Sequence, residues 1–483
     1  MHRLLLALAI CVPSGCAQQK FATTAPVSKA PIVDPGVPLS ELIEFDVVAG
    51  NRYVKSDAAG EVTIRLRVRT TERPNAARTP ANVGLVIDTS ASMRGEPIEQ
   101  ARQAALAMLD ALELGDQITV VAFHSRADLL VPTTVITEAE RPKLRKAIES
   151  MQATGTTALA QGLQAVVQHV SGHARPDMIN RVVLLSDGVP NDETEVRNIA
   201  AQAGQQSISI TALGLGLDYQ EALLADIAVA SRGRFHYIED ADQIATVFHD
   251  EVLHLERMLA QGSSLALRAG PGVRVLSVVG RPDVPVNGQQ VSFYVGDLAE
   301  NATKDVIVKL AIGPHRSATT VELLDATLTY QDPSNPSVPG MHDAFLAVEA
   351  TDDDAQRQTG IDPDVALVAA KASIAAETLQ IVDRARSGDI KGANAQLHSA
   401  EKRAKKLVAA NKDDELTKLS TQLSALKGNL ATIASTQPEP VAAPPAVGPG
   451  NAFPMDVQPR SQAADAGSMA LKKTHSDAFN IVN

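Results

Sequence analysis

The chain has 483 residues, which is enough for about three domains of ordinary size, and its hydrophobic content of 45 % is sufficient to build buried cores. Its formal net charge of −12 argues against binding of nucleic acid, which requires a basic surface. With aromatic residues at 3 % and no tryptophan, the stacking platforms that bind single strands are also poorly supplied. We therefore expect a multidomain globular protein that binds no nucleic acid.

The first 17 residues have the pattern of a secretory signal: a basic start, the apolar run Leu4–Val12, and then small residues. The Gly-Cys step at Cys16 resembles the lipobox of bacterial lipoproteins, in which this cysteine is acylated, although Pro13 stands where that pattern prefers an aliphatic residue. We expect an exported protein, a periplasmic or outer-membrane lipoprotein lipidated at Cys16. Ordinary cleavage after Ala17 and an uncleaved N-terminal helix remain alternatives.

Both cysteines of the chain, Cys11 and Cys16, lie in this segment, so the folded domains can form neither a disulfide nor a cysteine metal site. Residues 18–40 are rich in Ala, Pro, Val and Thr without periodicity, which predicts a flexible linker. We find no later segment apolar enough to span a membrane, so membrane contact is expected only through the lipid anchor.

Between residues 80 and 259, short apolar strands alternate with amphipathic helices, which is typical of a largely parallel sheet. We expect a doubly wound, Rossmann-like α/β domain over this range. The predicted strands are Val83–Asp88, Ile118–His124, Val182–Ser186 and Ile208–Gly214. The predicted helices are Pro97–Leu112, Arg141–Met151, Leu159–Val170, Glu193–Ala203, Gln220–Ala230 and Ala241–Leu255.

Alternating apolar and polar residues flank this domain on both sides. Glu61–Arg69 places four apolar side chains on one face, which predicts a half-buried strand. Because one strand region cannot form a stable sheet alone, we expect residues 41–79 and 260–335 to form one antiparallel β-sandwich into which the α/β domain is inserted. The later strands are predicted at Ser264–Arg268, Val273–Val279, Gln290–Val295, Asp305–Ile312 and Thr319–Tyr330.

Residues 360–435 are rich in Ala, Leu, Lys and Glu and predict about three antiparallel helices, with breaks at Ser387-Gly388 and Asn411–Asp414. An apolar stripe with alternating spacings of three and four favours packing on the rest of the chain, with a coiled-coil partner site as the alternative. Residues 436–483 begin with a Pro/Ala-rich stretch and show no periodicity, so we expect a disordered tail. The stripe consists of Leu416, Leu419, Leu423, Leu426, Leu430 and Ile433.

Oxygen-bearing side chains gather where two predicted strands end. Asp88, Ser90 and Ser92 follow the first strand of the α/β domain, and Asp187 follows the strand Val182–Ser186. A Gly-Thr-Thr stretch ending at Thr157 adds hydroxyls at a helix start. Carboxylates and hydroxyls form a hard-ligand set that suits Mg²⁺, Mn²⁺ or Ca²⁺. Two carboxylates neutralise a dication, so the ion keeps an open position for a further anionic ligand.

These positions resemble the metal-ion-dependent adhesion site of the von Willebrand factor A family, which consists of a D-x-S-x-S loop, a distant Thr and a later Asp. The resemblance implies that Ser90, Ser92 and Thr157 coordinate a divalent cation directly and that Asp88 and Asp187 act partly through water. Thr157 is chosen over Thr156 by its distance to the following Gly-Leu pair. The flanking strands and helices look like bacterial envelope proteins related to calcium-activated chloride channel and inter-α-trypsin inhibitor heavy-chain sequences.

No enzyme motif accompanies this site: the chain has no G-x-S-x-G elbow and no P-loop. His124 could approach the metal, but a structural hydrogen bond is the favoured role. We therefore expect a non-enzymatic, divalent-metal-dependent protein-binding protein of the cell envelope, with Mg²⁺ preferred, whose partner supplies an acidic side chain. A structural scaffold whose metal only stabilises loops is the alternative. Residues in the loops next to the site that could select the partner are Met93, Arg94, Glu96 and Asn191.

Overall fold

The computed structural model describes residues 38–73, 78–175, 177–188, 192–216, 220–256, 258–333, 335, 339–436 and 462–482. The predicted signal segment with Cys16 and nearly all of the predicted linker 18–40 lie outside the described residues.

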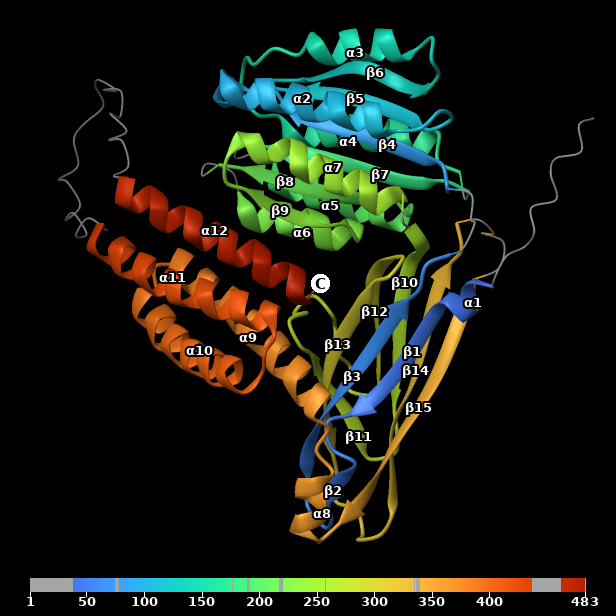
Figure 1. Cartoon of the computed structure of the whole chain (residues 1–483), viewed down its shortest axis with the longest axis vertical. Helices are drawn as coiled ribbons and strands as arrows, with labels where there is room; N and C mark the ends of the chain where they lie inside the picture. The colour runs from blue at the N-terminus through green and yellow to red at the C-terminus, as the bar shows by residue number, and fades with distance from the viewer. Residues whose placement is uncertain are drawn as a thin grey trace, which may run out of the picture. The chain divides into compact units, whose positions relative to one another are not determined.

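The α/β domain is built on a six-stranded sheet in the order β6-β5-β4-β7-β8-β9 (Figure 1). All neighbours are parallel except β6, which pairs antiparallel with β5 at the edge. Every residue of β4 and β7 is buried, as expected for parallel strands covered on both faces. The strands are β4 Ala81–Asp88, β5 Gln117–Phe123, β6 Ala127–Val135, β7 Ile179–Ser186, β8 Ser209–Leu215 and β9 Phe235–Ile238.

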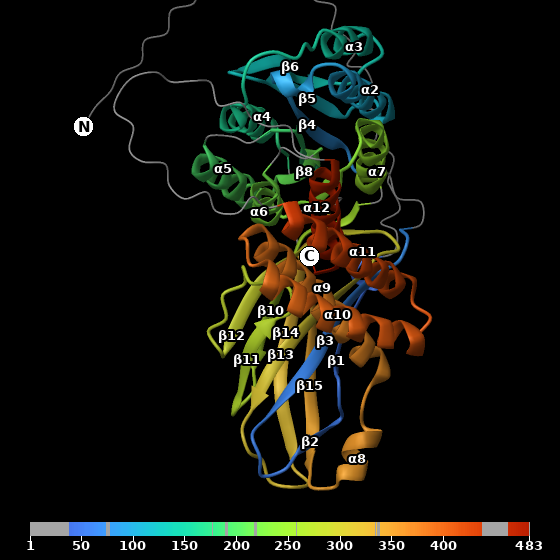
Figure 2. The same ribbon diagram turned by 90° about the vertical axis from the view of Figure 1, so that its left-hand side faces the viewer.

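Helices cover both faces of this sheet (Figure 2). One hydrophobic cluster joins the sheet to α2 and α7 through Met108 and Phe248, and a second joins the other face to α4 and α6 through Val166 and Leu224. All four predicted strands and all six predicted helices of this domain are present, whereas the edge strands β6 and β9 are not among the predicted strands. The helices are α2 Glu96–Ala111, α3 Arg141–Glu149, α4 Leu159–Gly172, α5 Glu193–Gln205, α6 Glu221–Ser231 and α7 Ile244–Glu256, with short 3₁₀ turns at Ala91–Met93 and Ala241–Gln243.

Strands from before and after the α/β domain share a second and a third sheet, of orders β1-β3-β13-β11 and β12-β10-β14-β15-β2. β3 pairs antiparallel with β13 over ten residue pairs, from Gly60↔Ile312 to Arg69↔Thr303. Both sheets contribute to one hydrophobic cluster. The strands are β1 Ile43–Ala49, β2 Tyr53–Lys55, β3 Gly60–Thr70, β10 Met258–Ala269, β11 Val273–Val278, β12 Gln290–Ala299, β13 Thr303–Ile312, β14 Thr320–Gln331 and β15 Gly340–Thr351.

Two details differ from the predicted boundaries of this region. The predicted range ends at residue 335, but the sheet continues through β15, which pairs along β14. Along the first half of β15 exposed side chains alternate with less exposed ones, but the exposed positions include the apolar Met341 and Phe345, so the sequence shows no clean alternation of apolar and polar residues. β2 pairs parallel with β15 and is only three residues long, too short to carry a period.

The helical region contains α8 Asp354–Thr359, α9 Pro363–Arg386, α10 Ile390–Ala410 and α11 Asp414–Thr436. The predicted breaks are confirmed, because α9 and α10 are separated at 387–389 and α10 and α11 at 411–413. Asp362 and Asp389 accept backbone hydrogen bonds at the starts of α9 and α10, as N-caps do. The described leucines of the stripe are at most 1 % exposed and pack within this chain, which favours the packing interpretation: Leu416, Leu419, Leu423, Leu426 and Leu430.

The prediction of a disordered tail over residues 436–483 is wrong for its last part, because Gln462–Val482 form the helix α12. Phe479 of α12 packs edge-to-face on Phe235 with ring centroids 5.9 Å apart, and Ser476 Oγ accepts a hydrogen bond from the backbone N–H of Tyr237 at 3.2 Å. Burial against β9 therefore stabilises this helix. Residues 437–461 of the predicted tail lie outside the described residues.

The expectation that no segment after the signal is apolar enough to span a membrane needs correction for α9. Among the described residues α9 is long and apolar enough to cross a membrane, by length and composition only. A core helix of a globular protein passes the same test. In this structure Ile374, Ile381 and Val382 of α9 are buried in the cluster formed with α10 and α11.

Candidate metal centre

The predicted ligands lie together at the carboxyl edge of the parallel sheet. Asp88 is the last residue of β4, and Asp187 directly follows the adjacent strand β7. The loop that ends at Thr157 precedes α4. Because parallel strands place their carboxyl ends at one edge, residues about 100 positions apart in the sequence meet there.

Asp88 is held from two sides. It is 0 % exposed; its Oδ1 accepts a hydrogen bond from the backbone N–H of Ser90 at 2.8 Å, and its Oδ2 accepts one from Ser186 Oγ at 3.0 Å. Burial raises the pKa of Asp88 above its usual range, although the hydrogen bonds from Ser90 and Ser186 act in the opposite direction. The carboxylate is thus oriented by two donors while it remains withdrawn from water.

Ser90, Ser92 and Asp187 form one hydrogen-bonded chain of oxygen atoms. Ser90 Oγ and Ser92 Oγ lie 2.9 Å apart, and Ser92 Oγ donates to Asp187 Oδ1 at 2.9 Å. Ser90 and Asp187 are buried and Ser92 between them is exposed, so the chain reaches the surface at Ser92. A divalent cation prefers such oxygen donors.

The structure separates the two threonines of the Gly-Thr-Thr stretch. A methyl group placed on Gly188 would lie 2.8 Å from Thr157 Oγ1, so this hydroxyl lies directly against the residue that follows Asp187. Thr156 instead donates its backbone N–H to Ser125 Oγ at 3.0 Å and is exposed. Thr157, and not Thr156, therefore lies against the backbone that follows Asp187. This geometry also explains Gly188, because any side chain there would displace Thr157.

Several residues that support the site were not predicted. Ser186 orients Asp88, as described above, and its place in the Ser-Asp-Gly stretch was a signal that could have identified it. Thr89 anchors the loop to β5 through its backbone N–H, which donates to the Phe123 carbonyl at 2.7 Å. Thr89 also accepts a hydrogen bond from the N–H of Thr154 at 2.7 Å, which ties two of the three loops together. No local sequence pattern marks that link.

The loop residues considered for partner selection have different positions. Met93 is 0 % exposed and belongs to the hydrophobic core, so it cannot contact a partner. Arg94 and Glu96 are exposed, and Asn191 lies outside the described residues. His124 Nε2 lies 3.2 Å from Asp128 Oδ2, which is the structural pairing that the sequence favoured.

The donor set fits a hard dication. Within the described parts of the chain, no group of three or more His, Cys, Asp or Glu side chains could hold a metal. The site has only two carboxylates, and its remaining donors are hydroxyls. This oxygen-only set suits Mg²⁺, Mn²⁺ or Ca²⁺ and lacks the thiolate and imidazole donors that favour zinc.

The doubly wound sheet with helices on both faces and a carboxylate and hydroxyl site at its carboxyl edge defines the class of this domain. Residues 82–250 match the family model of the von Willebrand factor type A domain. This segment of the chain is therefore a von Willebrand factor type A domain.

Curated relatives match the same part of the chain. An uncharacterised protein from Synechocystis is 28 % identical over 210 residues, which are 43 % of this chain and 49 % of that protein. Inter-alpha-trypsin inhibitor heavy chain H4 from Homo sapiens is 32 % identical over 188 residues, which are 36 % of this chain and 20 % of that protein. The chain thus spans about half of the first relative's length (49 %) and less of the second's.

Solved structures share the fold over more of the chain. A von Willebrand factor type A protein from Catenulispora acidiphila has a TM-score of 0.65 at 20 % identity and covers 80 % of this chain and 89 % of its own. The ArnB paralog VWA2 from Sulfolobus acidocaldarius has a TM-score of 0.57 at 16 % identity and covers 90 % of this chain and 98 % of its own. At these identities the likeness concerns the fold alone.

Proposed function

We propose that this protein binds a partner protein through a divalent metal ion held by Asp88, Ser90, Ser92, Thr157 and Asp187. The observation that carries the proposal is the chain of oxygens from buried Ser90 through exposed Ser92 to Asp187, with both hydroxyl contacts at 2.9 Å. A metal ion there would be bound from the interior and remain accessible from solvent.

The charge of the site favours an acidic ligand on the partner. The two carboxylates balance a dication, and the neutral hydroxyls of Ser90, Ser92 and Thr157 add no charge. An ion held in this way keeps enough positive charge to attract a further carboxylate, which completes the octahedral coordination that Mg²⁺ requires. Mg²⁺ is the ion we expect in the protein, and Mn²⁺ or Ca²⁺ can replace it.

Basic side chains next to the site support the same ligand. Arg94 follows the Ser92 loop and is exposed. The side chain of Arg126, two residues beyond His124 at the end of β5, is 73 % exposed, although Asp128 lies 2.8 Å from its Nε. Such residues steer an acidic partner and set specificity more than they add affinity.

The remaining parts of the chain complete the proposal. The two flanking sheets form a β-sandwich into which the von Willebrand factor A domain is inserted, and the helices α9–α11 pack as a bundle within the same chain. The protein is exported and anchored to the cell envelope through a lipid on Cys16. It acts as a binding protein and not as an enzyme, in keeping with a sequence that has neither a G-x-S-x-G elbow nor a P-loop.

A structural scaffold is the alternative, in which the metal only stiffens the three loops. The backbone hydrogen bonds between Thr154 and Thr89 and between Ala91 and Gly155 favour it, because they already tie these loops together. In a scaffold, a complex with a partner would survive removal of the metal. In the proposed function, chelation would dissociate it.

The test is calorimetric titration of the full chain with Mg²⁺ and Mn²⁺. The parent is expected to bind both ions, an Asp88→Ala, Ser90→Ala double variant neither, and a Thr156→Ala control both. Partners captured from envelope extracts in Mg²⁺ are expected to elute with EDTA. Absence of binding in the parent, or equal binding in the double variant, would refute the proposed site; partners that stay bound in EDTA would favour the scaffold.

A further inference from the structure

A cavity of about 400 Å³ lies at the opposite end of the parallel strands from the metal site. Arg181, near the start of β7, and Arg234, directly before β9, line it together with residues of β12, β13, α9 and α12. Along β7, Arg181 and Asp187 are separated by about 20 Å at the usual rise of a strand. The volume of the cavity falls within the range of roughly 300–1,000 Å³ that is usual for small-molecule sites.

The lining of this cavity is basic, although the chain as a whole has a net charge of −12. Three acidic side chains line it, Asp297, Asp305 and Glu415, and each has a cationic partner. The cationic side chains are twice as many: Arg181, Arg232, Arg234, Arg281, Lys304 and Lys371. Four of these cations also pair with carboxylates outside the lining: Arg181 and Arg234 with Glu251, Arg281 with Asp283, and Lys371 with Asp413. Within the described residues, the two lining cations without a carboxylate in a salt bridge are Lys304 and Arg232, and Arg232 lies over the ring of Tyr294.

Lys304, on β13, is one of these two cations. Its ammonium donates to the carbonyl of Val295, and within the described part of the chain no carboxylate pairs with it. A methyl group on Gly296, which has φ +81°, would lie 3.1 Å from Nζ, so this glycine leaves room for the ammonium. Burial lowers the pKa of Lys304 to about 8, helped by nearby arginines and opposed by Asp297. A bound anion would relieve this cost.

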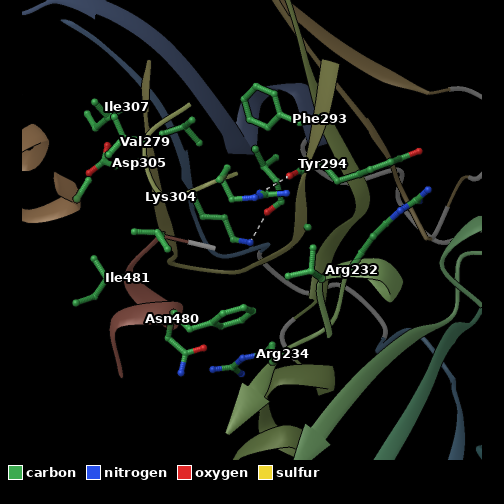
Figure 3. Close-up of a pocket in the computed structure, with 18 of the residues that line it drawn as sticks. Arg232, Arg234, Val279, Phe293, Tyr294, Lys304, Asp305, Ile307, Asn480 and Ile481 are labelled. Atoms are coloured by element: carbon green, nitrogen blue, oxygen red, sulfur yellow. Dashed lines mark hydrogen bonds between the residues drawn. The ribbon is translucent and has the colours of Figure 1, made fainter. Parts of the chain in front are cut away.

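Most of the uncharged residues in the lining are apolar. Figure 3 shows Val279 and Ile307 beside Lys304, with Ile481 of α12 on the same side and Arg234 and Asn480 further along the space. Apolar walls with a few placed polar groups are the usual construction of a small-molecule site. The arrangement matches a ligand with a charged end and an apolar end.

We propose that this cavity binds a small amphipathic anion, with its anionic headgroup beside Lys304 and its apolar part against Val279, Ile307 and Ile481. The site is separate from the metal centre, and the proposal does not depend on the function proposed for that centre.

An alternative role for the cations of the lining is to bind the last turn of α12. Asn480, Ile481 and Val482 line the cavity, and the carbonyls at a helix C-terminus carry partial negative charge. Such a partial charge compensates only part of the positive charge of an ammonium group. Lys304 donates to the carbonyl of Val295 in β12 instead. In this explanation the cations hold α12 in place, and no small molecule binds.

Calorimetric titration of the full chain with octyl phosphate, octanoate, octanol and inorganic phosphate tests the proposal. At least one of the two amphipathic anions is expected to bind at least tenfold more tightly than octanol and inorganic phosphate, and the one that binds identifies the headgroup. Octanol binding as tightly as the anions, or no binding of either anion, would overturn the proposal and assign the cations to α12.

Two variants locate the ligand. Lys304→Met is expected to weaken binding of the anion at least tenfold, whereas Lys309→Met, five positions along the same strand and outside the lining, leaves it unchanged within twofold. Ala372→Phe fills the cavity from α9 without changing a charge and is expected to abolish binding, which keeps the test usable should Lys304→Met not fold. Parent-like affinity in Ala372→Phe would overturn the proposal.

Discussion

The carboxyl ends of β4 and β7 carry Asp88 and Asp187 among hydroxyl groups, whereas the amino ends of β7 and β9 carry Arg181 and Arg234, which both pair with Glu251 beside the cavity. One sheet thus presents a site for a cation at one edge and a basic cavity at the other. The first is built by three short loops of the von Willebrand factor A domain itself. The second requires β12, β13, α9 and α12 as well, so it exists only when these elements pack together.

This difference has a consequence for stability. The oxygens of the metal centre satisfy one another through hydrogen bonds, as between Ser92 and Asp187. At the opposite edge no carboxylate among the described residues forms a salt bridge with Lys304, and its burial costs free energy in the absence of a ligand. Substitutions at the two edges should therefore affect stability and binding in different proportions.

The largest effect is expected at Arg181, whose side chain is 2 % exposed and lies 3.2 Å from Glu251 and 3.0 Å from Asp297. Arg181→Met leaves two carboxylates without this partner and should lower the free energy of unfolding by about 3–5 kcal/mol, with metal affinity unchanged. Urea denaturation and metal titration measure the two quantities. Arg175→Met removes an exposed pair with Asp177 and should cost at most about 0.5 kcal/mol; equal losses in both variants would contradict the prediction.

Substitution of Lys304 should raise the free energy of unfolding, whereas substitution of Arg181 should lower it. The pKa of Lys304 is about 8 in the folded protein against 10.5 in the reference state, so between these values the unfolded chain binds the proton more strongly. The penalty is therefore full below pH 8 and disappears as the pH rises toward about 10.5. Lys304→Met should be about 1–3 kcal/mol more stable than the parent at pH 7 and nearly equal at pH 10.5 in urea denaturation. A variant that is less stable at both pH values would show that the ammonium is satisfied.

Ser186 tests the orientation of Asp88 at the metal edge. Ser186→Ala removes the hydroxyl that donates to Asp88 Oδ2 and should weaken Mg²⁺ binding about 10–100-fold, as loss of an outer hydrogen bond to a ligand does. Ser186→Thr keeps the hydroxyl and should retain most of the affinity. Calorimetric titration of both variants with Mg²⁺ tests this prediction. Parent-like affinity in Ser186→Ala would mean that Ser90 alone orients the carboxylate of Asp88.

The smallest predicted effect is the difference in metal affinity between substitutions of Thr157 and of Thr156. Thr157→Ala should weaken metal binding about tenfold, since it removes a proposed direct ligand, whereas Thr156→Ala should change it by less than about threefold. Equal losses in the two variants would place both hydroxyls, or neither, on the ion.

Most of the metal centre was predictable because its determinants are local. Asp88, Ser90 and Ser92 are spaced along one loop after an apolar strand, and Asp187 follows another, so strand pattern and topology alone bring them to one edge. The support from Thr89 and Ser125 was not predictable. It depends on hydrogen bonds between loops whose contact partners no sequence period reveals.

The sequence by itself determined four of the six strands and the six helices of the α/β domain and the three helices of the 360–435 region, since burial on one face leaves a period in the residues. It also placed the proposed ligands Asp88 and Asp187 at the ends of two neighbouring strands. Only the tertiary structure decided the strand β15, the helix α12 and the basic cavity. Those features depend on contacts between distant segments, such as Phe479 with Phe235 and Arg181 with Asp297. Contacts of this kind override weak local preference, and their partners become known only once the chain has folded.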